Sequence, residues 1–198
     1  IGARGQYGHI QTQNVQADPS GGMGSLFPPP PTPAADQDFT VAFKRFSVYG
    51  YHQWEVTDWL ELIGGASYDW ISFPKTFRTT PISSREQTID QVSPKAGVIL
   101  RPLKDTVVRF AYTRSLSGAS IDQSYQLEPS QVAGFVQSFR SIIPDSIAGA
   151  NAGAKFETYG LSLEQKLPTR TYLGISGEIL NSELDRADGA FLVSPGVL

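Results

Sequence analysis

Cysteine is absent from this 198-residue chain, and methionine occurs only once. The lack of cysteine excludes disulfide scaffolds, thiolate zinc sites and cysteine nucleophiles. Charged residues are scarce, at 18% of the chain, whereas roughly 25% is usual in soluble domains. The net charge of -3 gives no electrostatic support for a nucleic-acid partner, so no such partner is expected.

Long hydrophobic runs are also missing, because no stretch approaches the roughly 20 apolar residues that a transmembrane helix needs. A membrane role is therefore open only to a β-barrel or to a peripheral protein. The chain begins Ile1-Gly2-Ala3, with neither a starting methionine nor the apolar stretch of a secretory signal. We therefore expect a mature or excised segment of a longer protein, with enough residues for one domain.

The most informative stretch is residues 46–70, where two extended runs are joined by Glu55-Val56-Thr57-Asp58. In the second run, apolar or small residues fall on one side: Leu60, Leu62, Gly64, Ala66, Tyr68 and Trp70. The other side is polar or small, with one exception at Ile63: Glu61, Ile63, Gly65, Ser67 and Asp69. Side chains alternate across a strand, so this pattern predicts a ribbon with one apolar face. The ribbon is typical of a transmembrane barrel hairpin, although a hairpin of a soluble sandwich or barrel fits this stretch equally well.

The connections alternate between short and long along the rest of the chain. Short links are predicted at residues 55–58, 102–105 and 168–170, and long ones at residues 16–38, 71–91 and 116–154. Bacterial membrane barrels have short periplasmic turns and long external loops. Soluble domains usually join strands with about 4–6 residues. The rhythm therefore favours an all-β, antiparallel, up-and-down transmembrane β-barrel, or part of one, with long external loops.

We expect residues 1–198 to form a single partial barrel domain. About seven strands are predicted if residues 3–15 form the first, whereas single-chain bacterial barrels close with an even number. Residues 16–38 are rich in glycine and proline, with four consecutive prolines after Phe27, and are predicted to form a stiff exposed loop. A ligand for a proline-reading groove is the less favoured interpretation of this segment.

The long link at residues 116–154 is predicted to contain a helix near residues 130–143. Apolar residues recur there at helical spacing between Pro129 and Pro144: Val132, Phe135, Val136, Phe139, Ile142 and Ile143. The polar side of this helix has only one basic residue, Arg140. We therefore expect the helix to pack against the body of the protein rather than on a membrane surface.

No catalytic, cofactor or metal site is expected. His9 and His52 lie far apart, no Gly-x-Ser-x-Gly motif is present, and Asp185, Asp188 and Gly189 lack the spacing of a calcium loop. The charged residues of the polar faces are instead predicted to face a wet lumen: Glu61, Asp69, Arg101 and Arg109. Aromatic residues near the strand ends are predicted to form the membrane girdles: Trp54, Trp59, Tyr68, Trp70 and Tyr112.

Several motifs resemble those of one known family. These are Tyr51-x-Gln53-Trp54-x-Val56-Thr57-Asp58-x-Leu60-x-Leu62 with Gly65-Ala66-Ser67-Tyr68-Asp69, then Ser93-Pro94-Lys95-x-Gly97 and Thr106-Val107-Val108-Arg109-x-Ala111-Tyr112. Over roughly residues 46–115, and more weakly to residue 184, they resemble the barrels of TonB-dependent outer-membrane receptors. Ser67 stands where that family usually has arginine, and Leu116-Ser117 replaces its usual aromatic-arginine pair. Residues 127–144 resemble barrels fused behind tetratricopeptide repeats.

The resemblance implies a receptor or channel, porin-like or energy-coupled, for transport across the bacterial outer membrane. Its partners would be outer-membrane lipid, an external ligand of unknown identity, and a periplasmic energy-coupling or repeat-domain protein. A soluble secreted β protein, binding glycans or proteins through its long loops, is the alternative hypothesis. An enzyme on a barrel scaffold is the third hypothesis, and it requires a cluster of serine, histidine and an acidic residue.

Overall fold

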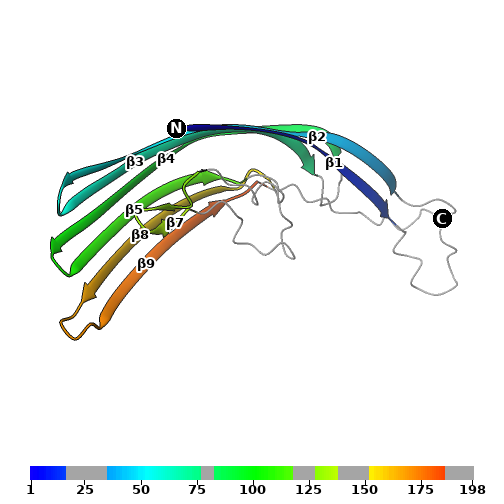
Figure 1. The fold of residues 1–198 in the computed structure, drawn as a ribbon. Helices are drawn as coiled ribbons and strands as arrows, with labels where there is room; N and C mark the ends of the chain where they lie inside the picture. The colour runs from blue at the N-terminus through cyan, green and yellow to red at the C-terminus, as the bar shows by residue number, and fades with distance from the viewer. Residues whose placement is uncertain (17–34, 77–82, 118–127, 138–151, 186–198) are drawn as a thin grey trace, which may run out of the picture.

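The computed structural model describes residues 1–16, 35–76, 83–117, 128–137 and 152–185. Its main element is an antiparallel seven-stranded sheet, bent into a curved wall, in the order β1-β2-β3-β4-β5-β8-β9 (Figure 1). The strands are β1 (Gly2–Gln16), β2 (Ala35–Thr57), β3 (Leu60–Thr76), β4 (Ser83–Leu103), β5 (Thr106–Leu116), β8 (Lys155–Lys166) and β9 (Tyr172–Glu183). The expected all-β, antiparallel, up-and-down fold is confirmed.

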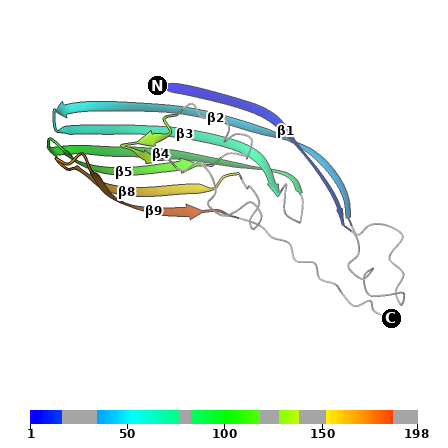
Figure 2. The ribbon, with the colours of Figure 1, turned by 60° about the horizontal axis from the view of Figure 1, so that its bottom comes forward.

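The strands follow one another across the sheet in chain order, as the turned view also shows (Figure 2). Over the described residues the sheet does not close on itself, and β1 and β9 are its two edges. It is therefore part of a barrel wall rather than a complete barrel. No helical span long and apolar enough to cross a bilayer is found in the described part of the chain.

Short turns join the strands at one end of the sheet, on the left in Figure 1. Between β2 and β3 the hydroxyl of Thr57 accepts a hydrogen bond from the amide of Leu60 at 3.1 Å. In the turn between β8 and β9, the amide of Leu167 donates to the carbonyl of Thr171 at 2.8 Å. Each turn closes within a few residues, which fixes the register of the strands on either side.

Several strands are longer than the sequence pattern predicts. Residues 71–76 and 83–91, predicted to be loop, continue β3 and β4, and residues 71–76 pair with residues 83–89. Residues 35–38, predicted to belong to the proline-rich loop, begin β2 and pair with β1. Ile71 and Phe73 are buried and Ile89 packs against them, so an alternating pattern was present in the supposed loop. Residues 17–34 lie outside the described residues.

The helix predicted near residues 130–143 is wrong over the part that the structure describes. Two short strands, β6 (Gln131–Val132) and β7 (Phe135–Val136), form a hairpin there instead. The residues between them, Ala133 and Gly134, have φ angles of 50° and 90°, as a tight hairpin turn requires. The same apolar spacing places Val132 opposite Phe135 in a hairpin. Residues 138–143 lie outside the described residues.

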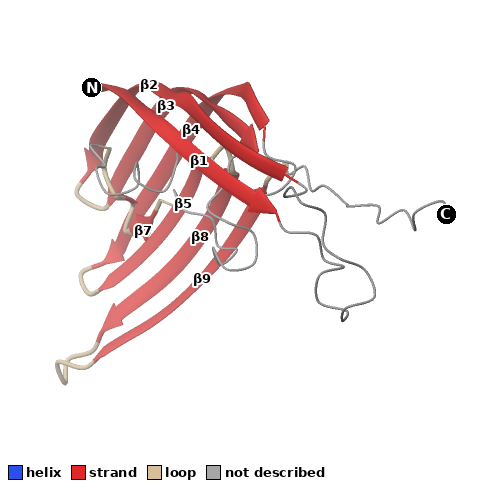
Figure 3. Cartoon of the chain, turned by 90° about the vertical axis from the view of Figure 1, so that its right-hand side faces the viewer, coloured by secondary structure: helices blue, strands red, loops and turns tan. Residues whose placement is uncertain are grey.

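The two faces of the seven-stranded sheet differ in what covers them. The β6–β7 hairpin packs on one face, here called the hairpin face, where Val132, Ala133 and Phe135 contact Ile99 and Ala111. A second apolar cluster lies toward the other end of the same face: Phe43, Ile71, Phe73, Leu116 and Ala152. The other face, here called the open face, has no second layer among the described residues. Figure 3 shows this single curved layer of strands with the hairpin beside it.

Candidate functional site

The hairpin face holds a buried ion pair in the middle of β2 and β3. Arg45 Nη2 lies 2.5 Å from Asp69 Oδ1, and both side chains are almost fully buried. Ser47 donates to the same oxygen at 2.5 Å, and Ser67 donates to Asp69 Oδ2 at 3.4 Å. Ser47 is directly opposite Asp69 in the β2–β3 register, so strand pairing itself assembles the group. The carboxylate is thus satisfied by several donors, as a buried charge requires.

A second polar group joins the segment that carries the β6–β7 hairpin, residues 128–137, to the sheet. It is here called the Glu128 network and consists of Tyr51, Lys95, Glu128 and Gln137. The fully buried Lys95 Nζ donates to Glu128 Oε2 at 3.2 Å and to Gln137 Oε1 at 2.5 Å. Tyr51 donates its hydroxyl proton to Glu128 Oε2 at 2.6 Å and accepts from Gln137 Nε2 at 3.1 Å. Gln137 Nε2 also donates to the carbonyl of Pro129 at 2.7 Å. Both ends of the hairpin segment are therefore tied to β2 and β4.

Two further ion pairs lie on the hairpin face toward the short turns. Arg101 Nη2 is 3.0 Å from Glu61 Oε2, and Gln53 donates to the other oxygen of that buried carboxylate. Arg109 pairs with Glu164 across β5 and β8. Gly134, at the tip of the hairpin, packs against the side chain of Arg109. The hairpin thus lies between the Glu128 network on one side and these charged pairs on the other.

The four residues predicted to face a lumen fall into three separate groups. Glu61 and Arg101 form one pair, Asp69 belongs to the buried ion pair with Arg45, and Arg109 pairs with Glu164. The structure therefore brings Glu61 and Arg101 together but does not bring Asp69 or Arg109 to them.

The sequence analysis did not identify four polar residues of the hairpin face: Arg45, Lys95, Glu128 and Gln137. Alternation along the strands contained the signal for Arg45 and Lys95, because each shares a face with polar strand residues. Glu128 and Gln137 carried no such signal, because they come from the long link and reach the sheet only through its folding.

The open face carries a band of partly or fully exposed apolar side chains, in register across four strands and continued on β9 by a glycine. One row runs Leu62, Val98, Phe110, Leu161 and Gly177, each directly opposite the next. Phe110 is 41% exposed and Leu161 59% exposed, although neither is near a chain end. Exposed apolar patches of this kind mark surfaces that contact a membrane, another protein or a ligand.

The aromatic residues predicted as girdles lie on this open face or at its turn-side end. Trp54 and Trp59 are about half exposed near the β2–β3 turn, and Trp54 meets the ring of His52 edge-on at 4.5 Å. Tyr68 and Trp70 lie half-buried further along β3. Tyr112 packs against Tyr159 at 5.0 Å and donates to Glu157 Oε1 at 2.8 Å.

Along β3, the distance from Leu60, which follows Trp59, to Trp70 is comparable with the thickness of a bilayer core. The step from Leu60 to Trp70, read at ~3.3 Å per residue, spans about 33 Å along the strand. At a tilt of about 40°, that length corresponds to a height of about 25 Å, which is the height of the apolar band on a membrane barrel.

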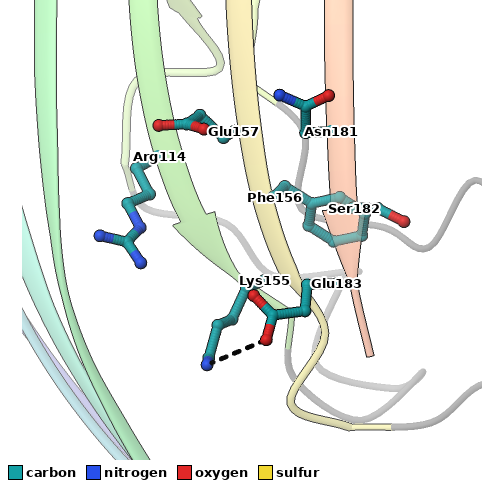
Figure 4. Close-up of a pocket in the computed structure, with 7 residues that line it drawn as sticks. All are labelled: Arg114, Lys155, Phe156, Glu157, Asn181, Ser182 and Glu183. Atoms are coloured by element: carbon teal, nitrogen blue, oxygen red, sulfur yellow. Dashed lines mark ion pairs between the residues drawn. The ribbon is translucent and has the colours of Figure 1, made fainter. Parts of the chain in front are cut away.

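A shallow cavity of about 230 Å³ opens where β5 and β9 end and β8 begins (Figure 4). It is lined by Arg114, Lys155, Phe156, Glu157, Asn181, Ser182 and Glu183. Lys155 Nζ and Glu183 Oε1 are 3.9 Å apart. The positive charges of Arg114 and Lys155 are equal in number to the negative charges of Glu157 and Glu183. The cavity therefore offers no excess charge to a ligand of either sign.

The histidines contact aromatic side chains. His9 Nε2 lies 3.1 Å from the hydroxyl of Tyr7, and His52 packs against Trp54. Among the described residues, no group of three or more histidine or acidic side chains is placed to hold a metal ion.

The chain was also compared with known proteins. A family model described as "TonB dependent receptor-like, beta-barrel" matches residues 2–163. Comparison with curated proteins and comparison with solved structures gave no match. The matched residues include β1 to β5, the β6–β7 hairpin and most of β8.

Proposed function

Because the chain belongs to the TonB-dependent receptor-like β-barrel family, we propose that it forms part of the wall of a receptor or channel in the bacterial outer membrane. The family is one of outer-membrane transport barrels and not of enzymes. The observation that carries the proposal is the contrast between the faces of the sheet, with buried ion pairs on one and a band of partly or fully exposed apolar side chains on the other.

Lipid is the neighbour that fits the open face. Hydrocarbon offers no hydrogen-bond partner, so a spanning sheet must pair its own backbone groups and present apolar side chains outward. The row through Val98, Phe110 and Leu161 meets this requirement. We assign the girdles of the membrane interfaces to Trp54, Trp59, Tyr68, Trp70 and Tyr112.

Water and a transported solute are the neighbours that fit the hairpin face. Glu61, Asp69, Arg101 and Arg109 would line the lumen, where ion pairs of both signs shape what passes. In this orientation the short turns face the periplasm and the long links face outward. An external ligand would meet the long links, and an energy-coupling or repeat-domain protein would act from the periplasmic side.

The test is the behaviour of the full-length protein in membrane fractions and on gels. A barrel of this kind is expected in the outer membrane, extractable only with detergent, and to migrate differently on a denaturing gel before and after boiling. A protein that stays monomeric and soluble without detergent would refute the proposal. In that case the apolar band would have to be covered by protein.

A further inference from the structure

The β6–β7 hairpin lies on the face assigned to the lumen, and we propose that residues 128–137 form a fixed constriction inside the barrel, held in place by the Glu128 network. The proposal rests on the proposed function, since it needs the hairpin face to line a lumen. It adds the element that narrows the passage and the residues that hold this element there.

The packing of the hairpin against the sheet is close. A Cβ at Gly97 would lie 2.9 Å from Cβ of Ala133, and a Cβ at Gly160 would overlap the ring of Phe135. Val132, Ala133 and Phe135 are each at most 5% exposed, although they belong to a hairpin of only a few residues. Two glycines on the sheet therefore make room for the hairpin to sit directly on the strands.

The Glu128 network explains why so short a hairpin stays in place. An isolated two-stranded hairpin is marginally stable in water at best. Here Lys95 and Tyr51 on the sheet bind Glu128 before the hairpin and Gln137 after it. Loss of Glu128 would leave the buried ammonium of Lys95 without its carboxylate, so the docked position would lose a major part of its stability.

The hairpin occupies space that a solute would otherwise use. Packed layers of strands lie about 10 Å apart, so a docked hairpin narrows the lumen by about that distance on this side. Its tip reaches Arg109, which is paired with Glu164. A solute passing the constriction would therefore meet the hairpin and this ion pair together.

The experiment measures the access of water to residues beneath the hairpin in the full-length protein, carried in a background without other cysteines. Ala111 is 2% exposed and packs under the hairpin, so an Ala111→Cys reporter should react slowly with a hydrophilic maleimide. Adding Glu128→Gln should raise that rate by about tenfold or more, because each 1.4 kcal/mol of lost docking energy is a factor of ten. Vesicles that contain the protein are also placed in solutions of sugars of increasing size, and their swelling is measured. The Glu128→Gln protein should admit larger sugars than the protein with Glu128.

Matched controls separate the network from general loosening. Glu183→Gln removes an exposed carboxylate whose nearest cation is 3.9 Å away, and it should leave the Ala111→Cys rate unchanged. A Ser176→Cys reporter, exposed on β9, should react quickly in every variant. If Glu128→Gln prevents folding, Phe135→Ala replaces it, because that change removes the ring packed on Gly160.

Each outcome decides a different point. An unchanged labelling rate at position 111 would overturn the role of the Glu128 network. A raised rate with unchanged sugar passage would overturn the constriction while leaving the barrel intact. A protein that needs no detergent and shows no heat-dependent gel migration would refute the proposed function itself.

Discussion

Gly160 on β8 is one of two sheet glycines against which the hairpin packs closely, and it illustrates how single residues shape this fold. A methyl group there would overlap the ring of Phe135. Gly160→Ala should therefore destabilise the full-length protein by about 1–3 kcal/mol, as overpacking usually does. Gly64→Ala is the matched control, because a Cβ at Gly64 meets nothing within 4 Å. The stability of each variant is measured as the temperature at which its folded gel band disappears. Equal temperatures for Gly160→Ala and Gly64→Ala would contradict this packing.

The ion pair of Arg45 and Asp69 gives a second prediction at the scale of residues. Both side chains are less than a tenth exposed, so Asp69→Asn removes the carboxylate from a buried guanidinium. We expect the free energy of unfolding to fall by about 3–5 kcal/mol, the usual cost of removing one partner of a buried ion pair. Glu183→Gln breaks an exposed contact and should cause no measurable loss. Both values are measured in detergent from the fraction of protein that runs as the folded gel band at increasing denaturant concentration. An unchanged free energy of unfolding for Asp69→Asn would contradict the burial of this pair.

Among the elements, the paired strands β8 and β9 allow lipid to be distinguished from water around the open face. Leu161 and Leu173 are about equally exposed, at 59% and 55%, but Leu161 lies within the apolar band and Leu173 lies beside the turn. In a bilayer, Leu161→Arg should cost about 2–4 kcal/mol and Leu173→Arg about 0–1 kcal/mol. Folding yield and stability in lipid vesicles measure the difference. Equal, small effects would contradict lipid contact, because water tolerates arginine at both positions.

The strands themselves were predictable from the sequence. Side chains alternate between the two faces of a strand, so a sheet with one apolar face leaves apolar residues at every second position. Residues 60–70 show this pattern clearly, and the structure keeps it. The extensions of β3 and β4 were missed because Pro74, Pro81 and several polar residues suggested a loop. The β6–β7 hairpin was missed because Val132, Phe135 and Val136 fit a helix as well as a hairpin. In the structure the hairpin packs closely against Gly97 and Gly160, which are distant in sequence and gave no local signal.

At the scale of the whole molecule, the buried polar groups and the exposed apolar groups are explained together by one arrangement. The sheet would separate lipid on the open face from a lumen on the hairpin face. The apolar row crosses β3, β4, β5, β8 and β9, which are neighbours in the sheet, so the contrast between the two faces extends over these strands. The Glu128 network could not be predicted locally, because it joins Tyr51 and Lys95 to residues that the chain brings back from a long link.

The most direct test of this arrangement is a spin label placed at Leu161, in the full-length protein reconstituted in lipid vesicles. Oxygen concentrates in hydrocarbon and a nickel chelate stays in water, so the collision rates of the label with each reagent identify its surroundings. A label at position 161 should collide often with oxygen and rarely with nickel, whereas one at the exposed Ser176 of β9 should show the opposite preference. Frequent nickel collisions at position 161 would mean that water covers the open face, and would contradict the membrane-spanning barrel.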